Sequence, residues 1–580
     1  MYIFHLNNNF ITPHWHFISL WLITAFLVAC EPEKTPDIII RDINVVDVEE
    51  GKVIEHQDVQ IAGNKIYKID DYDQTSNDEV KQIIDGSGKY LIPGLWDMHV
   101  HIRSYSHEEV LPLFILNGVT GVRDLGLTDL RLIKAWSEGI KRGEIVGPTI
   151  RTSGCIIEGS SPSFRNSIII SDIKKVMPTI DSLVAEGVDL IKLYDTLEKD
   201  VYEAIVNYCE TKGLLTAGHI PSSLNQIDAS DLGLNSIEHL SGLDKTLHKY
   251  YSQEDFDGLI ETLQLKGTYQ CPTLVNFSFL ASLDDSKKEE RKVILDQIDS
   301  EQRFDLAPKY YKAWWLRIKD NYSKSKKYKN KADQLSFYKG IIKKLNENGV
   351  KILAGTDTPN PYLLPGLSLH EELIMLVESG LTTSEALKTA TLYPAQYFND
   401  DNYSGNISKN TIADLVILDA NPLEDIANTQ QINSVILAGE VLSKDSLYSI
   451  RESLFNKTNR YSAKDFDQYM YMKLQKEGIN NIINNYAIPK SNNEYTIEET
   501  HLVRLSEVLK AANQINDAIK LLKWNIEIFP NYPKSYSSLG RLYLEQGDTT
   551  NAINNFKNLK IIDPLDSVNL GLLRKLSTTY

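Results

Sequence analysis

Cysteine is scarce in this chain, with 4 among 580 residues. A disulfide-held scaffold is therefore excluded, and a chain of this length can bury a large core without cross-links. Positive charge is also in deficit, because 61 Lys and Arg face 78 Asp and Glu and leave a net charge of −17. An acidic surface repels phosphate backbones, so we expect no nucleic-acid partner. Apolar residues at 42% and charged residues at 24% are near globular averages and exclude a disordered or multi-span membrane chain.

Charge is missing altogether from residues 1–29, which contain no Lys, Arg, Asp or Glu. Their apolar run from Phe17 to Ala29 is short for crossing a bilayer and has the length of a signal-peptide core. It ends in the string LVAC, which resembles the lipobox of bacterial lipoproteins. We therefore predict a signal peptide, a lipid on Cys30, a tether over 30–36 and an exported protein anchored to a membrane, facing the periplasm or the cell surface. Because no Lys or Arg precedes the apolar run, an N-terminal anchor helix or a leader extended by a wrong start site is the alternative.

The other end of the chain carries a repeat. Ala518 and Ala552 are 34 positions apart, and a proline follows each at the same distance. Apolar residues around them follow a helix–turn–helix pattern, so residues 496–580 resemble tetratricopeptide repeats, with 446–495 as a helical connector. Two such units are fewer than a free-standing array needs. The repeats either bind a protein partner or stabilise the rest of the chain, and the sequence leaves both open.

The middle of the chain alternates short apolar runs with helical stretches. Eight of the runs are candidate strands, at 96–101, 118–126, 149–159, 187–195, 214–220, 236–240, 268–276 and 351–358. Eight strand–helix units predict an α/β fold, a (β/α)8 barrel of the TIM type over residues 91–401. Residues 37–90 and 402–445 are rich in Ile and Val, and together they predict a small flanking β-sandwich. A helical excursion over the barrel mouth is expected within 281–345.

Two histidines open the barrel region. His99 and His101 stand two positions apart on the first predicted strand, so both side chains point to the same face. A pair of this kind is common by itself in half-buried strands. Here His219, His239 and Asp357 end three further strands, and the carboxyl ends of barrel strands meet at one mouth. Imidazole and carboxylate are ligands of zinc and related divalent ions, so the sequence predicts a metal centre at this mouth.

Lys192 lies in the string IKLYD on the fourth predicted strand and is expected at the same mouth. An ammonium group there would repel metal cations. Either Lys192 forms a salt bridge within the barrel, or its neutral amine reacts with CO2 to give a carbamate whose two oxygens can bridge two cations.

The order of the motifs resembles the amidohydrolase superfamily, in its imidazolonepropionase-like and Xaa-Pro dipeptidase-like branch. The strings cover about residues 37–445 and include LIPGLWDMHVH, LPLFILNGVTGVRDLG, DLIKLYD, TAGHI, SIEHL, AGTDT and IADLVILDANPLEDI. The resemblance implies two divalent ions, with zinc expected. One ion would be held by His99, His101 and Asp357, and the other by His219 and His239. Carboxylated Lys192 and a hydroxide would bridge the ions, and Asp357 would be the catalytic proton shuttle; some relatives use one metal and no carbamate.

Substrate recognition has a weaker signal. Four side chains near predicted strand ends could meet a substrate carboxylate or carbonyl, although packing would explain each of them: Arg103, Arg123, Tyr194 and Tyr269. Residues 155–164 lack the Gly-Gly-His string of some dipeptidase-like relatives, which weakens the transfer of a named substrate. We predict hydrolysis of an amide in a small cyclic-amide or dipeptide-like substrate. The alternatives are a mononuclear enzyme of deaminase or imidazolonepropionase type and a non-catalytic binding lipoprotein that uses its repeats; retention of every ligand residue argues against the latter.

Overall fold

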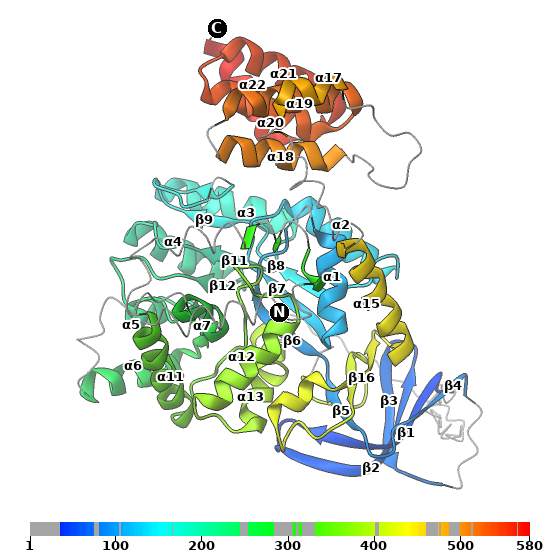
Figure 1. Ribbon diagram of the computed structural model, residues 1–580. Coiled ribbons are helices and arrows are strands. Elements are labelled where there is room, and N and C mark those ends of the chain that lie inside the picture. Colours follow the sequence, from blue (N-terminus) through cyan, green and yellow to red (C-terminus); the bar gives the residue numbers. More distant parts are fainter. Residues whose placement is uncertain are drawn as a thin grey trace, which may run out of the picture.

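The computed structural model in Figure 1 describes most of the chain between residues 35 and 579. The described residues are 35–74, 80–103, 106–164, 166–243, 253–282, 305–308, 311–312, 314–315, 331–400, 405–459, 474, 477–485, 499–511, 514–564 and 566–579. The predicted signal peptide and Cys30 lie outside these residues, as do most of the tether and much of the 281–345 and 446–495 segments. Among the described residues, no helix is both long enough and apolar enough to cross a membrane.

The two Ile- and Val-rich flanking pieces join in one eight-stranded sheet. Its strands are β1 (Ile38–Asp47), β2 (Lys52–Ala62), β3 (Lys65–Asp71), β4 (Gln82–Asp85), β5 (Tyr90–Pro93), β15 (Leu415–Leu418), β16 (Ile432–Leu437) and β17 (Glu440–Leu442). Their order is β17-β16-β15-β5-β1-β2-β3, and β4 pairs with β1. Antiparallel pairing of β15 with β5 connects the two pieces. Side chains alternate between the faces of a strand, and the buried members, such as Ile40, Ile61 and Ile417, form an aliphatic core.

The middle region consists of parallel strands, which confirms the predicted α/β class. Its strands are β6 (Leu95–Val100), β7 (Val119–Asp124), β8 (Thr149–Thr152), β9 (Ile156–Glu158), β10 (Ile168–Ile169), β11 (Leu190–Leu193), β12 (Leu215–Gly218), β13 (Ser236–Glu238) and β14 (Tyr269–Cys271). Strands β6, β7 and β8 pair in one sheet, and the order β10-β9-β11-β12-β13-β14 forms another. Parallel strands that alternate with helices are the arrangement of a barrel-type domain.

The eighth predicted strand, residues 351–358, is irregular rather than a regular strand, and it lies between the two parallel sheets. Single bridges join it to β14 on one side and to β6 on the other. The Asp357 amide donates to the His99 carbonyl at 2.8 Å. The Asp97 carboxylate on β6 accepts the Thr356 amide at 3.0 Å and the Thr356 hydroxyl at 2.7 Å. Side-chain hydrogen bonds therefore replace part of the backbone ladder here.

The third predicted strand, residues 149–159, is divided into two. Its first part, β8, pairs with β7, and its second part, β9, pairs with β11. Gly154 lies between the parts with a φ of +67°, a left-handed conformation that glycine adopts without a Cβ penalty. Because of this turn, the two parts of one predicted strand pair in two different parallel sheets.

Helices follow most of the parallel strands and surround them in Figure 1. Helix α2 shows why they form: the Asp129 side chain caps the Arg131 amide at 2.9 Å, and Leu130, Ile133 and Trp136 bury one face. The helices of this region are α1 (His107–Leu116), α2 (Leu130–Lys141), α3 (Val176–Glu186), α4 (Lys199–Thr211), α5 (Gln226–Asp231), α6 (Gln253–Lys266), α7 (Leu274–Ser282), α11 (Lys331–Glu347), α12 (Leu367–Glu378), α13 (Thr383–Thr389), α14 (Leu392–Phe398) and α15 (Lys444–Asn459).

The C-terminal region is helical and has an apolar core of its own. Its helices are α17 (Ile479–Asn485), α18 (Glu499–Ala511), α19 (Ile515–Ile528), α20 (Pro533–Glu545), α21 (Thr549–Ile562) and α22 (Ser567–Thr579). A Cβ at Gly540 would lie 2.6 Å from the Phe556 ring, so close packing of α20 on α21 requires glycine here. In the preceding unit Ser506 is buried, and its hydroxyl donates to the Val503 carbonyl at 2.6 Å. Ser506 stands 34 positions before Gly540, where the repeat would have a glycine, and this bond satisfies its hydroxyl group.

Candidate metal centre

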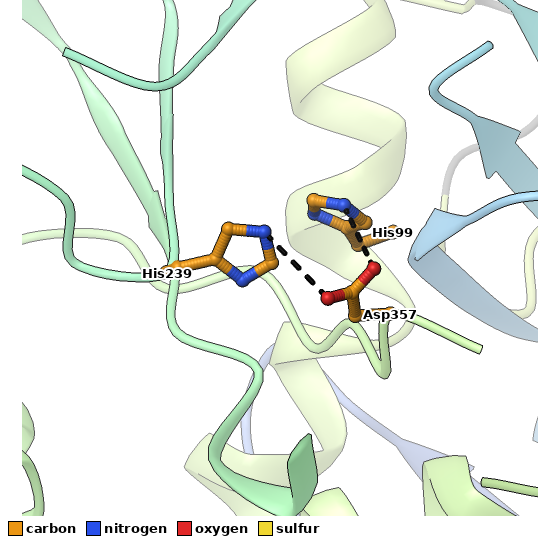
Figure 2. A group of neighbouring side chains, drawn as sticks. All are labelled: His99, His239 and Asp357. Atoms are coloured by element: carbon orange, nitrogen blue, oxygen red, sulfur yellow. Dashed lines mark ion pairs between the residues drawn. The ribbon is translucent and has the colours of Figure 1, made fainter. Parts of the chain in front are cut away.

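The structure brings three of the predicted histidines onto one carboxylate. His99 at the end of β6 and His101 just beyond it direct their Nε2 atoms at Asp357 Oδ1, at 3.5 Å and 3.4 Å. His239, directly after β13, has its Nε2 atom 3.8 Å from Asp357 Oδ2. Figure 2 shows the Asp357 carboxylate facing the rings of His99 and His239. Potential ligand atoms of these two histidines and Asp357 all lie within 4.8 Å of one another.

His219, directly after β12, completes the group of imidazoles. Its ring centroid is 4.9 Å from that of His239, which in turn is 4.5 Å from that of His99. Burial lowers the pKa of His99 and of His219 well below the usual value, and the positive charge of Lys192 lowers both further. Neutral imidazoles are the form that coordinates metals, so the lowered pKa values favour His99 and His219 as ligands.

Lys192 on β11 is buried, with 1% of its surface exposed. Within the described part of the chain, its Nζ atom has no hydrogen-bond partner. Burial is also the main reason why the pKa of this amine falls to about 8. A buried cationic group without partners is costly, so Lys192 is disposed to react or to bind as a neutral amine.

Asp357 has two differently engaged oxygens. Its Oδ1 faces His99 and His101, whereas its Oδ2 accepts amide hydrogens from Asn276 at 2.9 Å and Asn360 at 2.6 Å. Burial by itself would raise the pKa of Asp357, but the neighbouring imidazoles outweigh it and hold the pKa below the usual range. The residue has a left-handed φ of +64°, an arrangement that is costly outside glycine and that clusters at functional sites.

Asn276 owes its position to a buried carboxylate on a different helix. It lies in the first turn of α7, where the Glu372 carboxylate from α12 accepts the amides of Leu274 and Val275 at 2.9 Å and 2.7 Å. Burial raises the pKa of Glu372 to about 8. The sequence carried no signal for the contact of Asn276 with Asp357, because the two residues are far apart in the chain. Neither Asn276 nor Asn360 belongs to a recognisable motif.

Two histidines receive their orientation from residues that sequence reasoning missed. His99 Nδ1 lies 2.6 Å from Glu238 Oε2, and His239 Nδ1 lies 2.6 Å from the Thr273 hydroxyl. Groups that hold the second ring nitrogen fix the orientation of a metal-binding imidazole. A signal existed for Glu238, a carboxylate inside the buried strand string SIEH, but its partner could not be read from the sequence.

The donor set of this cluster fits a divalent cation. His99 Nε2 and Lys192 Nζ are buried atoms that lack a hydrogen-bond partner among the described residues. Nitrogen and carboxylate donors converging in this way suit zinc and related ions. Imidazole nitrogens and the ionised Asp357 carboxylate supply the lone pairs that such an ion needs.

The four predicted substrate residues occupy different surroundings. Arg123 is fully buried and binds Glu238 and the Met98 carbonyl, so its described contacts are with the protein itself. Tyr194 is half-buried and stacks on His219, with ring centroids 4.1 Å apart. Arg103 is half-buried just beyond β6. Tyr269 begins β14, at the end of the strand opposite to the metal cluster, and packs against Tyr397 at 5.4 Å.

Comparison with known proteins assigns the class. The sequence profile of the amidohydrolase family matches residues 90–442, so the chain belongs to this family. It is accordingly a hydrolase acting on carbon–nitrogen bonds, of a family that typically uses divalent metal ions.

Individual relatives are more distant. Ochratoxinase of Aspergillus niger is 24% identical over 408 residues, which cover 60% of this chain and 73% of the relative. The match to the dihydroorotase of Carboxydothermus hydrogenoformans is 38% identical but spans only 28% of that protein's length. Among solved structures, bottromycin amidohydrolase has a TM-score of 0.59 at 21% identity, with 72% of this chain and 90% of that chain covered. A Xaa-Pro dipeptidase has a TM-score of 0.53 at 21% identity, covering 70% and 99%. At these identities the structural likeness shows the fold.

Proposed function

We propose that this protein hydrolyses an amide bond in a small cyclic-amide or dipeptide-like molecule, at a metal centre in the mouth of a closed (β/α)8 barrel. The observation that carries the proposal is the convergence of three imidazoles on one ionised aspartate. The His219 ring and a buried lysine lie beside them, and the lysine Nζ has no hydrogen-bond partner among the described residues. The likeness to a Xaa-Pro dipeptidase favours a dipeptide-like substrate. The eight-stranded sheet that contains β1 and β15 would be the flanking sandwich of this barrel.

The proposed metal ligands are the ones that the resemblance to the amidohydrolase superfamily implies. His99, His101 and Asp357 would hold one ion, and His219 and His239 would hold the second. Carboxylated Lys192 would be shared by the two ions, as the resemblance implies, and the charge of its buried amine lowers the pKa of both His99 and His219. Divalent ions, zinc by preference, would supply Lewis acidity that polarises the amide carbonyl and acidifies water.

The other residues would bind substrate and move the proton. Asp357 is ionised and faces the cluster, so it can accept a proton from the attacking water and deliver it to the leaving nitrogen. Tyr194 and Arg103 are half-buried residues near the same strand ends, and their side chains could bind a substrate carbonyl or carboxylate. The buried ion pair of Arg123 makes it a residue of the protein framework rather than of the substrate site.

A direct test combines metal analysis with a substrate screen. We expect about two divalent ions per chain, and hydrolysis of one class among dipeptides, N-acyl amino acids and lactams. A strong chelator should abolish the activity, and added zinc should restore it. Full activity in metal-free protein would contradict the proposal.

Lys192 distinguishes two metals from one. If its carbamate bridges the ions, Lys192→Ala should lose the activity and one ion, and short-chain carboxylic acids should partly restore both, because their oxygens can occupy the bridge. A Lys192→Ala protein that retains its metal content and its turnover would favour the mononuclear alternative.

The two ends of the chain would determine its location. Export through residues 1–29 and lipid on Cys30 would anchor the protein to a membrane, and Cys30→Ser should then abolish lipid labelling and release the protein from membranes. An intact N-terminus on soluble protein would contradict this.

The helices of 496–580 would form tetratricopeptide-like repeats that bind a protein partner, and deleting them should abolish partner capture without changing turnover.

A further inference from the structure

A buried ionic network lies directly behind the metal cluster and is not part of the ligand set. Glu238 and Arg123 are both fully buried. Glu238 Oε2 lies 2.6 Å from His99 Nδ1. Glu238 Oε1 accepts hydrogen bonds from Arg123 Nη2 at 2.7 Å and from the Ser236 hydroxyl at 2.6 Å. One carboxylate therefore connects the ends of three strands: β6, β7 and β13.

Arg123 is anchored on the strand that carries His99. Its Nε donates to the Met98 carbonyl at 2.6 Å, and its guanidinium lies 5.0 Å from the centre of the Tyr397 ring. The arginine thereby supplies a fixed positive charge beside Glu238. A rigid guanidinium on a strand is a better support than a flexible ammonium, because its planar donors hold one geometry.

We propose that Glu238, supported by Arg123, is a positioning residue that fixes His99 in the Nδ1–H tautomer and directs the Nε2 lone pair at the cation. A carboxylate can only accept, so His99 Nδ1 must donate to it, and the proton is thereby removed from Nε2. His99 Nε2 faces Asp357 and has no hydrogen-bond partner within the described residues, as expected of a ligand atom prepared for a metal. The inference rests on the proposed metal centre.

The same network defines what an isosteric substitution would do. In Glu238→Gln, the donors from Arg123 and Ser236 retain the amide oxygen at the position of Oε1. The amide NH2 group must then face His99, where it donates to Nδ1. This shifts the ring proton to Nε2 and removes the lone pair that the metal needs. The variant should keep the shape of the site while reversing one tautomer.

The experiment measures tautomer and metal affinity separately. In metal-free protein with nitrogen-labelled histidine, His99 should change from Nδ1–H in the wild type to Nε2–H in Glu238→Gln. Zinc affinity, from competition with a chromophoric chelator, should fall by about 10-fold to 100-fold. Asp414→Asn is the matched control, because Asp414 is a buried residue directly before β15 of the flanking sheet, and its carboxylate accepts the Ala438 amide at 2.6 Å. The control should bind zinc like the wild type.

A second variant covers poor folding of Glu238→Gln. Glu238→Asp keeps the carboxylate but shortens its reach, so it should retain the Nδ1–H tautomer and have an intermediate zinc affinity. The proposal is overturned if the folded variants bind zinc like the wild type, or if His99 keeps the Nδ1–H tautomer in Glu238→Gln. A wild type that binds no zinc would instead overturn the metal centre itself.

An independent observation concerns the wall beside His219. The loop after β9 is anchored by Glu158, which is buried and accepts the amides of Ser163 and Phe164 at 2.8 Å and 3.1 Å, and also the Ser167 hydroxyl. Its Phe164 ring lies edge-on to Tyr194 at 5.3 Å, and Tyr194 stacks on His219. Both residues are half-buried, so part of each remains accessible, and Tyr194 connects Phe164 to the candidate ligand His219.

We infer that Phe164 and Tyr194 form a subsite for an aromatic or bulky apolar group of the substrate. Rings that are held rigidly and left partly open gain free energy when an apolar group covers them. The anchoring of the loop by Glu158 prepares the wall before substrate arrives, which reduces the entropy cost of binding. This inference deepens the proposed function, since it names a feature of the substrate of the same site.

Product-like ligands test the subsite without turnover. On metal-loaded protein, calorimetry should show that N-acetyl-phenylalanine binds about 10-fold to 100-fold more tightly than N-acetyl-alanine. Phe164→Ala should remove most of this preference, whereas Phe455→Ala, at a phenylalanine 40% exposed on α15, should keep it. A wild type without the preference, or a preference that survives in Phe164→Ala, would overturn the subsite. Failure of the metal centre would be recognised separately by the absence of bound zinc.

Discussion

The interiors of the flanking sheet and of the parallel-strand region are built on different principles. The sheet buries aliphatic side chains such as Ile43 and Ile417, whose burial only stabilises the fold. The parallel strands bury Arg123, Lys192 and Glu238, whose removal from water costs free energy unless every charge is compensated. The parallel-strand region therefore accepts a cost in folding free energy in order to hold charged side chains at the candidate metal centre.

Backbone conformation follows the same division. His239, directly after β13, and Asp357, in the irregular 351–358 segment, have left-handed φ values of +59° and +64°. Such a conformation costs about 1–3 kcal/mol in a residue other than glycine. In both residues it brings the side chain to the cluster instead of continuing the strand. The free energy gained in the sheet and the surrounding helices is what makes this strain tolerable.

The largest effect is expected at Asp357. Asp357→Asn keeps the shape and one coordinating oxygen but removes the base, so turnover should fall by about 10²–10⁴-fold while the fold is kept. Turnover and metal content are measured on the same preparation. Near-normal turnover in a variant with its full metal content would show that Asp357 only holds the metal.

The reverse result is expected in the sheet. Ile43→Ala removes a fully buried side chain and leaves a cavity, so the free energy of unfolding should fall by about 2–5 kcal/mol with unchanged zinc affinity and turnover. Ile54→Ala, at a position 40% exposed on the neighbouring strand, is the control and should change little. Denaturant titration measures both. A loss of zinc affinity in Ile43→Ala would show that the two regions are coupled.

A pH effect on stability is expected where the two regions meet. His370 is buried between the Thr429 hydroxyl at 2.8 Å and the Asn117 carbonyl at 3.0 Å, and burial lowers its pKa to about 4. The unfolded histidine, with a pKa of about 6.5, takes up its proton first as the pH falls. Stability should therefore be complete above pH 6.5 and fall by about 2 kcal/mol by pH 5.

The control for this effect is His370→Gln, which cannot be protonated. Its unfolding free energy should be lower at neutral pH but should lack this share of the fall between pH 6.5 and pH 5. Parallel pH profiles for the wild type and the variant would contradict the assignment to His370.

The smallest effect is expected at Asn360. Asn360→Ala removes one of the two amides on Asp357 Oδ2, and a hydrogen bond to a charged group is worth enough for a fall in turnover of about 10-fold. Asn433→Ala is matched, because Asn433 donates to Asp419 at 2.8 Å on the exposed surface of the sheet. Turnover at saturating substrate measures both. Equal effects in the two variants would contradict a special role for the amide at Asp357.

Local patterns predicted the parallel strands and the residues at their ends. The apolar runs before His99, Lys192, His219 and His239 became strands β6, β11, β12 and β13. A strand has a period of two and a fixed end, so neighbouring residues in the chain suffice to recognise it. The same rule failed at 351–358, where Asp97 and the left-handed Asp357 replace part of the ladder, and at Tyr269, which begins its strand instead of ending it.

The sequence by itself determined which side chains could meet at one mouth, because strand ends and residue types are local properties. Only the tertiary structure decided what each of them touches. Glu238 reaches His99 from another strand, Arg123 binds inward to Glu238, and Asn276 meets Asp357 through a helix held by Glu372. These contacts join segments far apart in the chain, and they depend on distances of a few tenths of an ångström that no local pattern encodes. The candidate ligands could therefore be proposed from the motifs, whereas the network around them follows from packing.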